Sequence, residues 1–240
     1  MSSLVARLDR AFYAGFRGNW DDELFRQAIL EVLEPRHVVL DLGAGAGIVA
    51  QMDFKGNVAR ICGVDPDPRV ATNPHLDEGM VGVGERVPYA DGMFDVVFAN
   101  NVLEHLTDPV SVFREVLRVL KPGGLFLAKT PNKRHYMPLI ARLTPHRFHQ
   151  FVNRLRGRAS VDTFPTAYKV NTPGDVRRCA ARAGFAVDSI RLIEGRPEYL
   201  RWAALPYLFG ILYERLVNAI SALAPLRILL VIRLRKPAGA

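Results

Sequence analysis

His37-Val-Val-Leu-Asp-Leu-Gly-Ala-Gly-Ala-Gly47 is the stretch that decides the fold, because a short apolar run ends in an acid and turns at once into alternating glycines. Apolar runs of this kind are typical of fully buried strands in parallel sheets. Glycine permits a tight turn and lets a ligand approach the backbone without a Cβ in the way. Behind the turn we expect a helix N-terminus, whose free N–H groups would face that ligand.

Similar apolar runs recur along the chain, and predicted helices or turns separate them. The further runs are Ala59–Val64, Met80–Val83, Phe94–Ala99, Leu125–Ala128, Phe185–Ile193 and Arg227–Arg233. The clearest helix is Pro109–Leu120, which Lys121-Pro-Gly-Gly124 should end through a left-handed glycine cap. A second helix should begin at Thr172-Pro173 and run to Gly184. Strands that alternate with helices predict an α/β fold around a mostly parallel sheet.

The length of 240 residues fits one domain, residues 1–240, in four parts. Residues 1–36 form a helical N-terminal cap, 37–130 the ligand-binding core, 131–171 a basic insertion after the fifth strand, and 172–240 the rest of the sheet. Two apolar stretches, Trp202–Tyr213 and Leu216–Leu226, are each too short to span a membrane. We interpret them as a sheet-covering helix, with peripheral membrane contact as the alternative.

Composition narrows the class of protein. Hydrophobic residues make up 49% and charged residues 23% of the chain, which is ordinary globular usage. The two cysteines, Cys62 and Cys179, lie far apart, which excludes a disulfide framework and favours the cytoplasm. The N-terminus does not have the pattern of a signal peptide. The net charge of +8 is concentrated, since Val116–Val161 contains ten Lys and Arg residues and no Asp or Glu.

The glycine spacing bears on the ligand. A nicotinamide-binding turn needs a third glycine at position 48, where this chain has Ile48. Asp41 lies two residues before the first glycine, and its charge favours a cationic ligand over a pyrophosphate. The next strand ends in Gly63-Val-Asp65-Pro66, where an acid can accept both hydroxyls of a ribose. The alternatives are an ordinary loop and an aspartate that caps the following turn.

Five segments in this order resemble the class I S-adenosylmethionine-dependent methyltransferases, in particular the small-molecule group related to quinone-biosynthesis methyltransferases. They are Val39–Gly47, Gly63–Asp65, Arg86–Val97, Asn101–Leu106 and Arg118–Gly124. The resemblance implies a Rossmann-like, doubly wound sheet of seven strands, mostly parallel with an antiparallel last strand. It also implies the cofactor S-adenosyl-L-methionine.

The resemblance assigns cofactor-binding roles. Asp41 and the glycines of the turn, Gly43, Gly45 and Gly47, would hold the amino acid end of the cofactor. Asp65, followed by Pro66, would take the ribose hydroxyls, and Asn100 would lie beside the cofactor. The family often has an acid at the end of the third strand for the adenine amino group, but the aligned residue is Val83. Adenine recognition would then fall to backbone groups or to Glu85.

Two histidines are candidates for the catalytic base that a hydroxyl acceptor needs. His105 follows the fourth strand and His135 follows the fifth, although each could instead be structural. We expect residues 131–171 to form a lid whose Tyr136, His146 and Arg147 contact the acceptor. Its charge would select an anionic acceptor or carrier, and a solvated basic face is the alternative. The i, i+3 pair His146 and His149 lacks a nearby acid or cysteine, so no metal is predicted.

The sequence therefore predicts a cytoplasmic methyltransferase that methylates an oxygen of a small or carrier-linked acceptor. The basic insertion adds an anionic acceptor as one option. One alternative is a non-catalytic S-adenosylmethionine-binding regulatory protein. Another is a nicotinamide-dependent oxidoreductase, against which Ile48 and Glu104-His105-Leu106 argue. Nucleic acid ranks below small molecules as a partner, because the chain contains no recognisable RNA-binding module.

Overall fold

Seven strands form one sheet in the order β3-β2-β1-β4-β5-β7-β6 in the computed structural model, which describes residues 3–16, 18–143 and 165–239. The strands are β1 (Val38–Leu42), β2 (Arg60–Asp65), β3 (Glu78–Val81), β4 (Phe94–Asn100), β5 (Leu120–Pro131), β6 (Ala186–Ile193) and β7 (Leu229–Arg235). The first five are parallel, and β1 lies between β2 and β4 with Asp41 opposite Gly63 and Phe98.

Strand β7 runs against β5. The Gly123 N–H donates to the Lys236 carbonyl at 3.0 Å, and the Asn132 N–H donates to the Ile228 carbonyl at 2.6 Å. Residue numbers rise on one strand as they fall on the other, which defines an antiparallel pair. The predicted mostly parallel, seven-stranded sheet with an antiparallel last strand is confirmed.

The chain divides into two compact units. Unit 1 takes in Met1–Asp21, Pro131–Pro165 and Leu192–Leu229, and unit 2 takes in Asp22–Thr130, Thr166–Arg191 and Leu230–Ala240. Residues 131–143 of the predicted insertion thus share a unit with the N-terminal helix and with the segment before β7, whereas residues 166–171 belong to unit 2.

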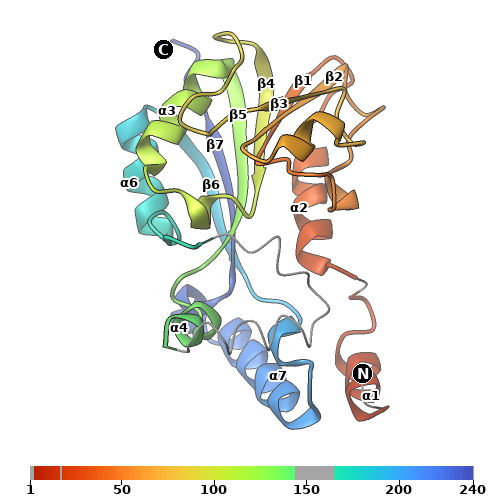
Figure 1. The fold of residues 1–240 in the computed structure, drawn as a ribbon. Coiled ribbons are helices and arrows are strands. Elements are labelled where there is room, and N and C mark those ends of the chain that lie inside the picture. Colours follow the sequence, from red (N-terminus) through yellow and green to blue (C-terminus); the bar gives the residue numbers. More distant parts are fainter. Residues whose placement is uncertain (1–2, 17, 144–164, 240) are drawn as a thin grey trace. The chain divides into compact units, whose positions relative to one another are not determined.

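Unit 2 contains most of the sheet and its helices, α2 (Trp20–Leu30), α3 (Pro109–Val119) and α6 (Pro173–Ala183). Figure 1 shows α3 and α6 on one side of the sheet and α2 on the other. The sequence specifies their ends: Asp108 and Thr172 accept from the Ser111 and Asp175 N–H groups as N-caps, each followed by proline. Gly184 ends α6 in the left-handed conformation, as predicted.

Two local expectations were wrong. The glycine turn leads to a three-residue 3₁₀ helix, Ala50–Met52, and not to an α-helix, and the rest of the connection to β2 contains the left-handed Gly56. Lys121–Gly124 does not cap α3 either: Leu120 already pairs with Phe94, and the next pair is Val96 with Leu125. The left-handed Gly123 therefore serves an irregularity within β5.

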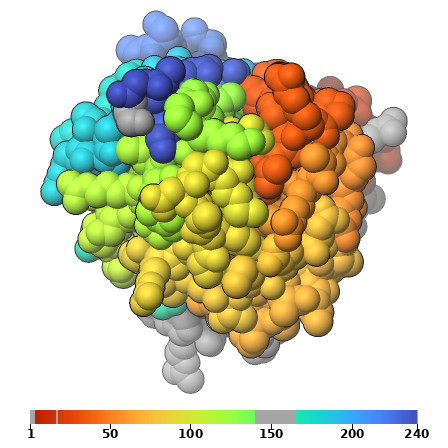
Figure 2. All heavy atoms as spheres, turned by 90° about the horizontal axis from the view of Figure 1, so that it is seen from above, coloured from red at the N-terminus to blue at the C-terminus, as the bar shows by residue number. Residues whose placement is uncertain are grey.

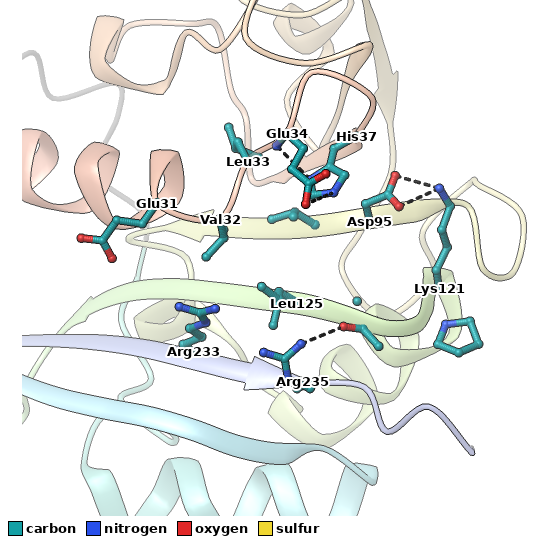
Figure 3. Close-up of a pocket in the computed structure, with 14 residues that line it drawn as sticks. Glu31, Val32, Leu33, Glu34, His37, Asp95, Lys121, Leu125, Arg233 and Arg235 are labelled. Carbon is teal, nitrogen blue, oxygen red and sulfur yellow. Dashed lines mark hydrogen bonds and ion pairs between the residues drawn. The ribbon is translucent and has the colours of Figure 1, made fainter.

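A crevice lies at the amino end of the parallel strands, opposite the glycine turn. Figure 2 looks onto this edge, where the dark blue C-terminal segment lies beside the green segment that contains Lys121. Within the crevice, the Lys121 ammonium pairs with both carboxylate oxygens of Asp95 at 2.8 and 2.7 Å (Figure 3). The Arg235 guanidinium donates to the Gly123 carbonyl at 3.2 Å. These charges hold strand ends together, so we interpret the crevice as structural.

Unit 1 contains α1 (Ser3–Phe12), α4 (Tyr136–Leu143) and α7 (Ala204–Ala219). Val5 and Tyr13, from and just after α1, pack against Tyr207 and Ile211 of α7. The Tyr13 hydroxyl donates to Glu214 at 3.0 Å. The expected sheet-covering helix at 202–226 is thus an α-helix packed on α1, with much of its apolar surface exposed. No helix among the described residues is long and apolar enough to cross a membrane.

Candidate functional site

Three glycines shape the turn after β1, and each is needed for a different reason. All have positive φ: 82° at Gly43, 51° at Gly45 and 73° at Gly47. A Cβ on Gly43 would lie 2.3 Å from Val102 Cγ2, and one on Gly47 would lie 2.4 Å from Asn73 Oδ1. A Cβ on Gly45 would meet only Asp65 Oδ2, at 3.9 Å. The middle glycine therefore leaves open backbone that a ligand can approach.

Asp65, the last residue of β2, holds the turn. Its Oδ2 accepts from the Gly45 N–H at 2.9 Å, and its Oδ1 accepts from the Asp67 N–H at 2.7 Å. A carboxylate offers about four acceptor positions, so each oxygen keeps capacity for one further donor. The carboxylate is half-buried and beside the open Gly45 backbone. This arrangement suits a pair of vicinal hydroxyls.

Asn73 locks the other side of the turn. Its Nδ2 donates to the Ala44 and Gly45 carbonyls at 3.0 and 3.2 Å, and its Oδ1 accepts from the His75 N–H at 2.9 Å. The side chain is 7% exposed. Sequence reasoning missed this residue, because nothing in the Thr72–His75 segment indicates that it reaches back to the glycines.

Asp41 is buried on β1 directly before the turn, with 5% of its surface exposed. Burial raises the pKa of its carboxyl well above the usual range, and the nearby negative charge of Asp65 raises it further. A cation bound at the turn would stabilise the ionised form of Asp41. The charge pattern that the sequence predicted, an acid behind the glycines, is present and is desolvated.

Asn100, at the end of β4, belongs to a buried polar cluster that the sequence did not reveal. Its Nδ2 donates to Asp22 Oδ1 at 3.0 Å, and the Lys129 ammonium donates to the same oxygen at 2.5 Å. Lys129 is fully buried on β5, and Asp22 in α2 is 7% exposed. Because Asp22 can only accept when ionised, it fixes the orientation of the Asn100 amide. Asn100 Oδ1 is buried and has no hydrogen-bond partner among the described residues.

Glu104 joins the β4 loop to β5 and to the segment before α6. Its carboxylate accepts from the Thr130 hydroxyl at 2.8 Å, and Thr130 accepts from Asn171 Nδ2 at 2.7 Å. Burial raises the pKa of Glu104. The next residue, His105, is half-buried at the end of the 3₁₀ helix Leu103–His105 in the same unit. Glu104 thus fixes the loop that carries the predicted base.

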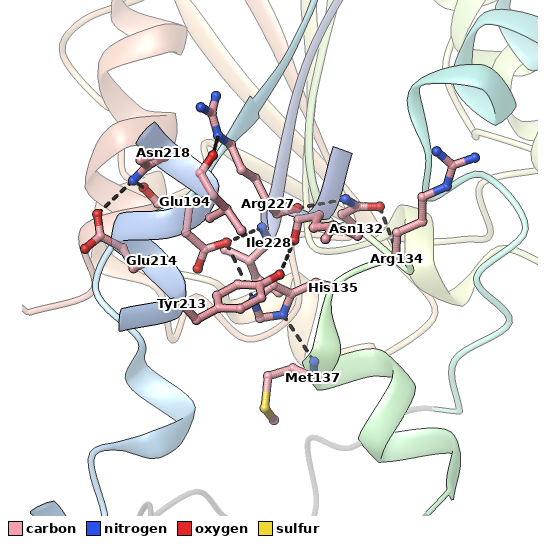
Figure 4. A network of polar contacts seen from close by, with 12 residues as sticks. Asn132, Arg134, His135, Met137, Glu194, Tyr213, Glu214, Asn218, Arg227 and Ile228 are labelled. Carbon is pink, nitrogen blue, oxygen red and sulfur yellow. Dashed lines mark hydrogen bonds and ion pairs between the residues drawn. The ribbon is translucent and has the colours of Figure 1, made fainter. Parts of the chain in front are cut away.

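His135 lies in a polar network of unit 1 (Figure 4). Its Nδ1 accepts from the Met137 N–H at 3.2 Å, and its Nε2 is 3.5 Å from Glu194 Oε2. The His135 and Tyr136 rings lie 4.0 Å apart, and both contact Tyr213. The His135 side chain is only 2% exposed, so it is enclosed within the unit. Burial and the charge of Glu194 raise the pKa of Tyr136.

Of the other predicted site residues, three lie on exposed loops and two fall outside the described part of the chain. Pro66, Val83 and Glu85 are exposed on loops of unit 2, after β2 and β3. His146 and Arg147 lie outside the described residues. Among the residues that are described, no group of three His, Cys, Asp or Glu side chains is placed to hold a metal ion.

The sheet order, the glycine turn and the acid at the end of β2 together define the class I methyltransferase architecture. A model of the methyltransferase domain family matches residues 40–128. An uncharacterised methyltransferase of Mycobacterium sp. (strain KMS) is 39% identical over 103 residues, which are 41% of this chain and 40% of the relative. A ubiquinone biosynthesis O-methyltransferase of Bradyrhizobium sp. is 34% identical over 102 residues, 40% of each chain. The chain thus matches less than half the length of these relatives.

Solved structures agree on the fold. The cyclase SpnF superimposes with a TM-score of 0.59 at 20% identity, covering 93% of this chain and 84% of that one. Geranyl diphosphate C-methyltransferase from Streptomyces coelicolor, in complex with S-adenosyl-L-homocysteine, superimposes with a TM-score of 0.54 at 18% identity. The match covers 97% of this chain and 82% of that one. Residues 40–128 therefore match the methyltransferase domain family, and the fold of the chain is shared with a solved methyltransferase.

Proposed function

We propose that this protein transfers a methyl group from S-adenosylmethionine to an oxygen atom of a small or carrier-linked, anionic acceptor. The observation that carries the proposal is the glycine turn, in which the Gly45 N–H donates to Asp65, within a region that matches the methyltransferase domain family. The fold alone does not settle the chemistry, since one structural neighbour is a cyclase. The argument therefore rests on the residues around the turn.

The residues present fit the cofactor. Asp65 has acceptor capacity for two ribose hydroxyls beside the open backbone of Gly45. Asp41 supplies a buried carboxyl whose ionised form the ammonium of the amino acid end would stabilise. Asn100 Oδ1 offers a preoriented acceptor for one more donor. Pro66 and Glu85 are exposed on loops of the same unit, and adenine recognition would rest on Glu85 or on backbone groups.

Bound S-adenosylmethionine supplies a methyl group on a sulfonium centre that is already activated. The protein aligns the acceptor oxygen with that carbon and excludes water, which accounts for on the order of 7–11 kcal/mol in well-oriented reactions. The acceptor oxygen forms the new bond while the carbon–sulfur bond breaks, and the hydroxyl proton passes to a base. His105 is our first candidate for that base and His135 the second.

The O-methyl and anionic assignments have separate support. A relative with 34% identity is named as an O-methyltransferase. Three of the ten basic residues in the acid-free run Val116–Val161 pair with acids outside it, namely Arg118, Lys121 and Lys129. We propose that the other seven, which lie within residues 131–171, select the acceptor by charge, with Tyr136, His146 and Arg147 as contacts. A structural neighbour acts on a diphosphate. The two free, buried cysteines suit a reducing compartment, so we place the reaction in the cytoplasm.

An acceptor panel tests the proposal. Purified protein is incubated with S-adenosylmethionine and with matched phenols, carboxylates, phosphorylated sugars and lipid-linked alcohols, and products are detected by the gain of one methyl mass. We expect methyl ethers or esters, and a lower KM for anionic acceptors than for neutral analogues. Products methylated only on carbon or nitrogen would contradict the O-methyl assignment, and bound cofactor with no product would favour a regulatory role.

The two histidines are separated by comparing kcat with stability. His105→Asn should lower kcat by about a hundredfold or more with little change in unfolding temperature, whereas His135→Asn should act mainly through stability, because His135 is enclosed. If a folded His135 variant alone loses kcat, His135 is the base. If neither variant does, the reaction takes its proton acceptor elsewhere.

A further inference from the structure

Helix α7 leaves one long face apolar and exposed. Leu205, Leu208, Phe209, Leu212 and Leu216 recur at intervals of three or four residues, with Trp202 before the helix and Ile220 after it. We call these seven residues the α7 stripe. Leu205 is 65% exposed, Phe209 63% and Leu212 56%. Residues at this spacing share one face of a helix.

The opposite face of α7 is already satisfied. Tyr207 is fully buried, and Ile211 and Val217 are nearly so. Glu214 accepts from the Tyr13 hydroxyl at 3.0 Å and from Asn218 at 2.7 Å. Asp9 of α1 accepts from the Tyr207 hydroxyl at 2.5 Å. One face of the helix therefore holds it against α1, and the stripe lies on the face that α1 does not contact.

An exposed apolar patch of this extent marks an interaction site in most proteins. Isolated exposed leucines need no explanation, but here five large apolar side chains line one face of a 16-residue helix and two more flank its ends. Any apolar partner that covered the stripe would remove the energetic cost of hydrating it. The charged residues of unit 1 indicate what kind of partner this is.

Among the described residues of unit 1, the exposed charged side chains are all positive. Its acidic residues in the described ranges, Asp9, Asp21, Glu194, Glu198 and Glu214, are all buried or half-buried. Its exposed charged side chains in the same ranges are all arginines, Arg7, Arg10, Arg134 and Arg215, of which Arg215 is 55% exposed and lies 3.4 Å from Glu214. Arg215 lies within α7 itself. An apolar helix face accompanied by exposed cations fits a surface that is both apolar and anionic.

We propose that the α7 stripe docks on an anionic phospholipid bilayer, with the helix lying in the interface. The helix is too short to span the hydrocarbon core, which needs about 20 apolar residues, and the interfacial position buries only one face. Trp202 would lie at the headgroup level, where tryptophan is favoured. A second copy of this chain is a poorer occupant, since two such units would bring like charges together. The proposal is independent of the methyltransferase activity.

Vesicle binding tests it on the full chain without cofactor or acceptor. Vesicles of phosphatidylcholine with phosphatidylglycerol are compared with vesicles of phosphatidylcholine alone, by flotation and by tryptophan emission, to which Trp20 and Trp202 both contribute. We expect binding to the anionic vesicles, a blue shift, and quenching by brominated lipid. Phe209→Glu with Leu212→Glu should weaken binding by about a hundredfold, because two buried side chains are lost.

Arg36→Glu is the matched control. It changes net charge by the same two units, and Arg36 is 81% exposed in unit 2. Its vesicle affinity should stay within about twofold of wild type, since the substitution lies outside unit 1 and leaves every residue of the stripe unchanged. Thermal unfolding shows whether the double variant is folded, and if it is not, Leu205→Ser with Leu212→Ser replaces it.

Three outcomes overturn the proposal. One is wild-type protein that fails to bind anionic vesicles. Another is a folded double variant that binds them as well as wild type. The third is a wild-type dimer that the double variant converts to a monomer with no vesicle binding in either form, which would assign the stripe to self-association.

Discussion

Asp22 shows how a residue far from any motif can control a site. It lies in α2, yet its carboxylate accepts from Asn100 Nδ2 and from the Lys129 ammonium. Lys129 directly follows the apolar run Leu125–Ala128, and a lysine at the end of a buried strand is a signal for a paired group. Its partner was not visible, because residues 22, 100 and 129 meet only once β4, β5 and α2 are in place.

Removing one partner of the buried pair should cost more than removing both. Asp22→Leu leaves the buried Lys129 ammonium without this carboxylate and should lower the free energy of unfolding by about 3 kcal/mol. Adding Lys129→Met should recover most of that loss. Urea denaturation of the four proteins of the cycle measures the coupling. Equal losses in the single and double variants would show that the two residues do not act as a pair.

Asp41 should make stability and cofactor affinity depend on pH in opposite directions. Its pKa in the folded, cofactor-free protein lies above the value of about 3.9 in an unfolded chain. Between these two pKa values the folded state binds the extra proton, so the free energy of unfolding falls as pH rises through that window. A bound cation favours the ionised carboxylate, so affinity for S-adenosylhomocysteine should rise over the same window.

Asp41→Asn should abolish both trends. In this variant the unfolding temperature should no longer fall as pH rises. Its affinity for S-adenosylhomocysteine, measured by calorimetric titration, should be weaker than that of wild type and should not change with pH. Wild-type protein whose unfolding temperature and affinity do not change with pH would mean that Asp41 titrates normally. The sequence indicated the acid and its sign, but not its desolvation, which depends on the strands β2 and β4 on either side.

At the level of elements, the predicted strands and the caps of α6 are present, since buried apolar runs and capping residues are local signals. Thr172-Pro173 and Gly184 bound α6 as expected. The helix expected after the glycine turn is absent from β1–β2, where Ala50–Met52 forms a short 3₁₀ helix. Motif reasoning failed there because a glycine turn describes ligand approach and not the length of the connection. Lys121–Gly124 failed similarly, because glycines suit a strand irregularity as well as a helix cap.

The glycine turn itself can be tested with a matched pair of alanine substitutions. Gly47 and Gly56 both have positive φ, 73° and 79°. A Cβ on Gly56 meets nothing within 4 Å, whereas one on Gly47 meets the Asn73 amide. Both variants should lose about 1 kcal/mol of stability from backbone strain. Only Gly47→Ala should also lower affinity for S-adenosylhomocysteine, by about tenfold or more. Equal affinities would remove Asn73 from the account of the turn.

At the scale of the molecule, sheet order was predictable and the division into units was not. The five ordered motifs imply the seven-stranded sheet, because strand order follows from the family architecture. Grouping residues 1–21 with 192–229 depends on contacts such as Tyr13 with Glu214, which no local pattern announces. The exposed face of α7 was mistaken for a buried one for the same reason: apolar periodicity gives the face but not its neighbour.

The account depends on a cationic nucleoside bound at the glycine turn through Asp65. Isothermal titration with S-adenosylhomocysteine measures this most directly, with NAD as the competing ligand and Asp91→Ala, an exposed acid of the same unit, as the control. We predict binding of S-adenosylhomocysteine but not of NAD, a loss of about a hundredfold in Asp65→Ala from two missing charged hydrogen bonds, and no change in Asp91→Ala. Undiminished binding in folded Asp65→Ala, or binding of NAD alone, would contradict the account.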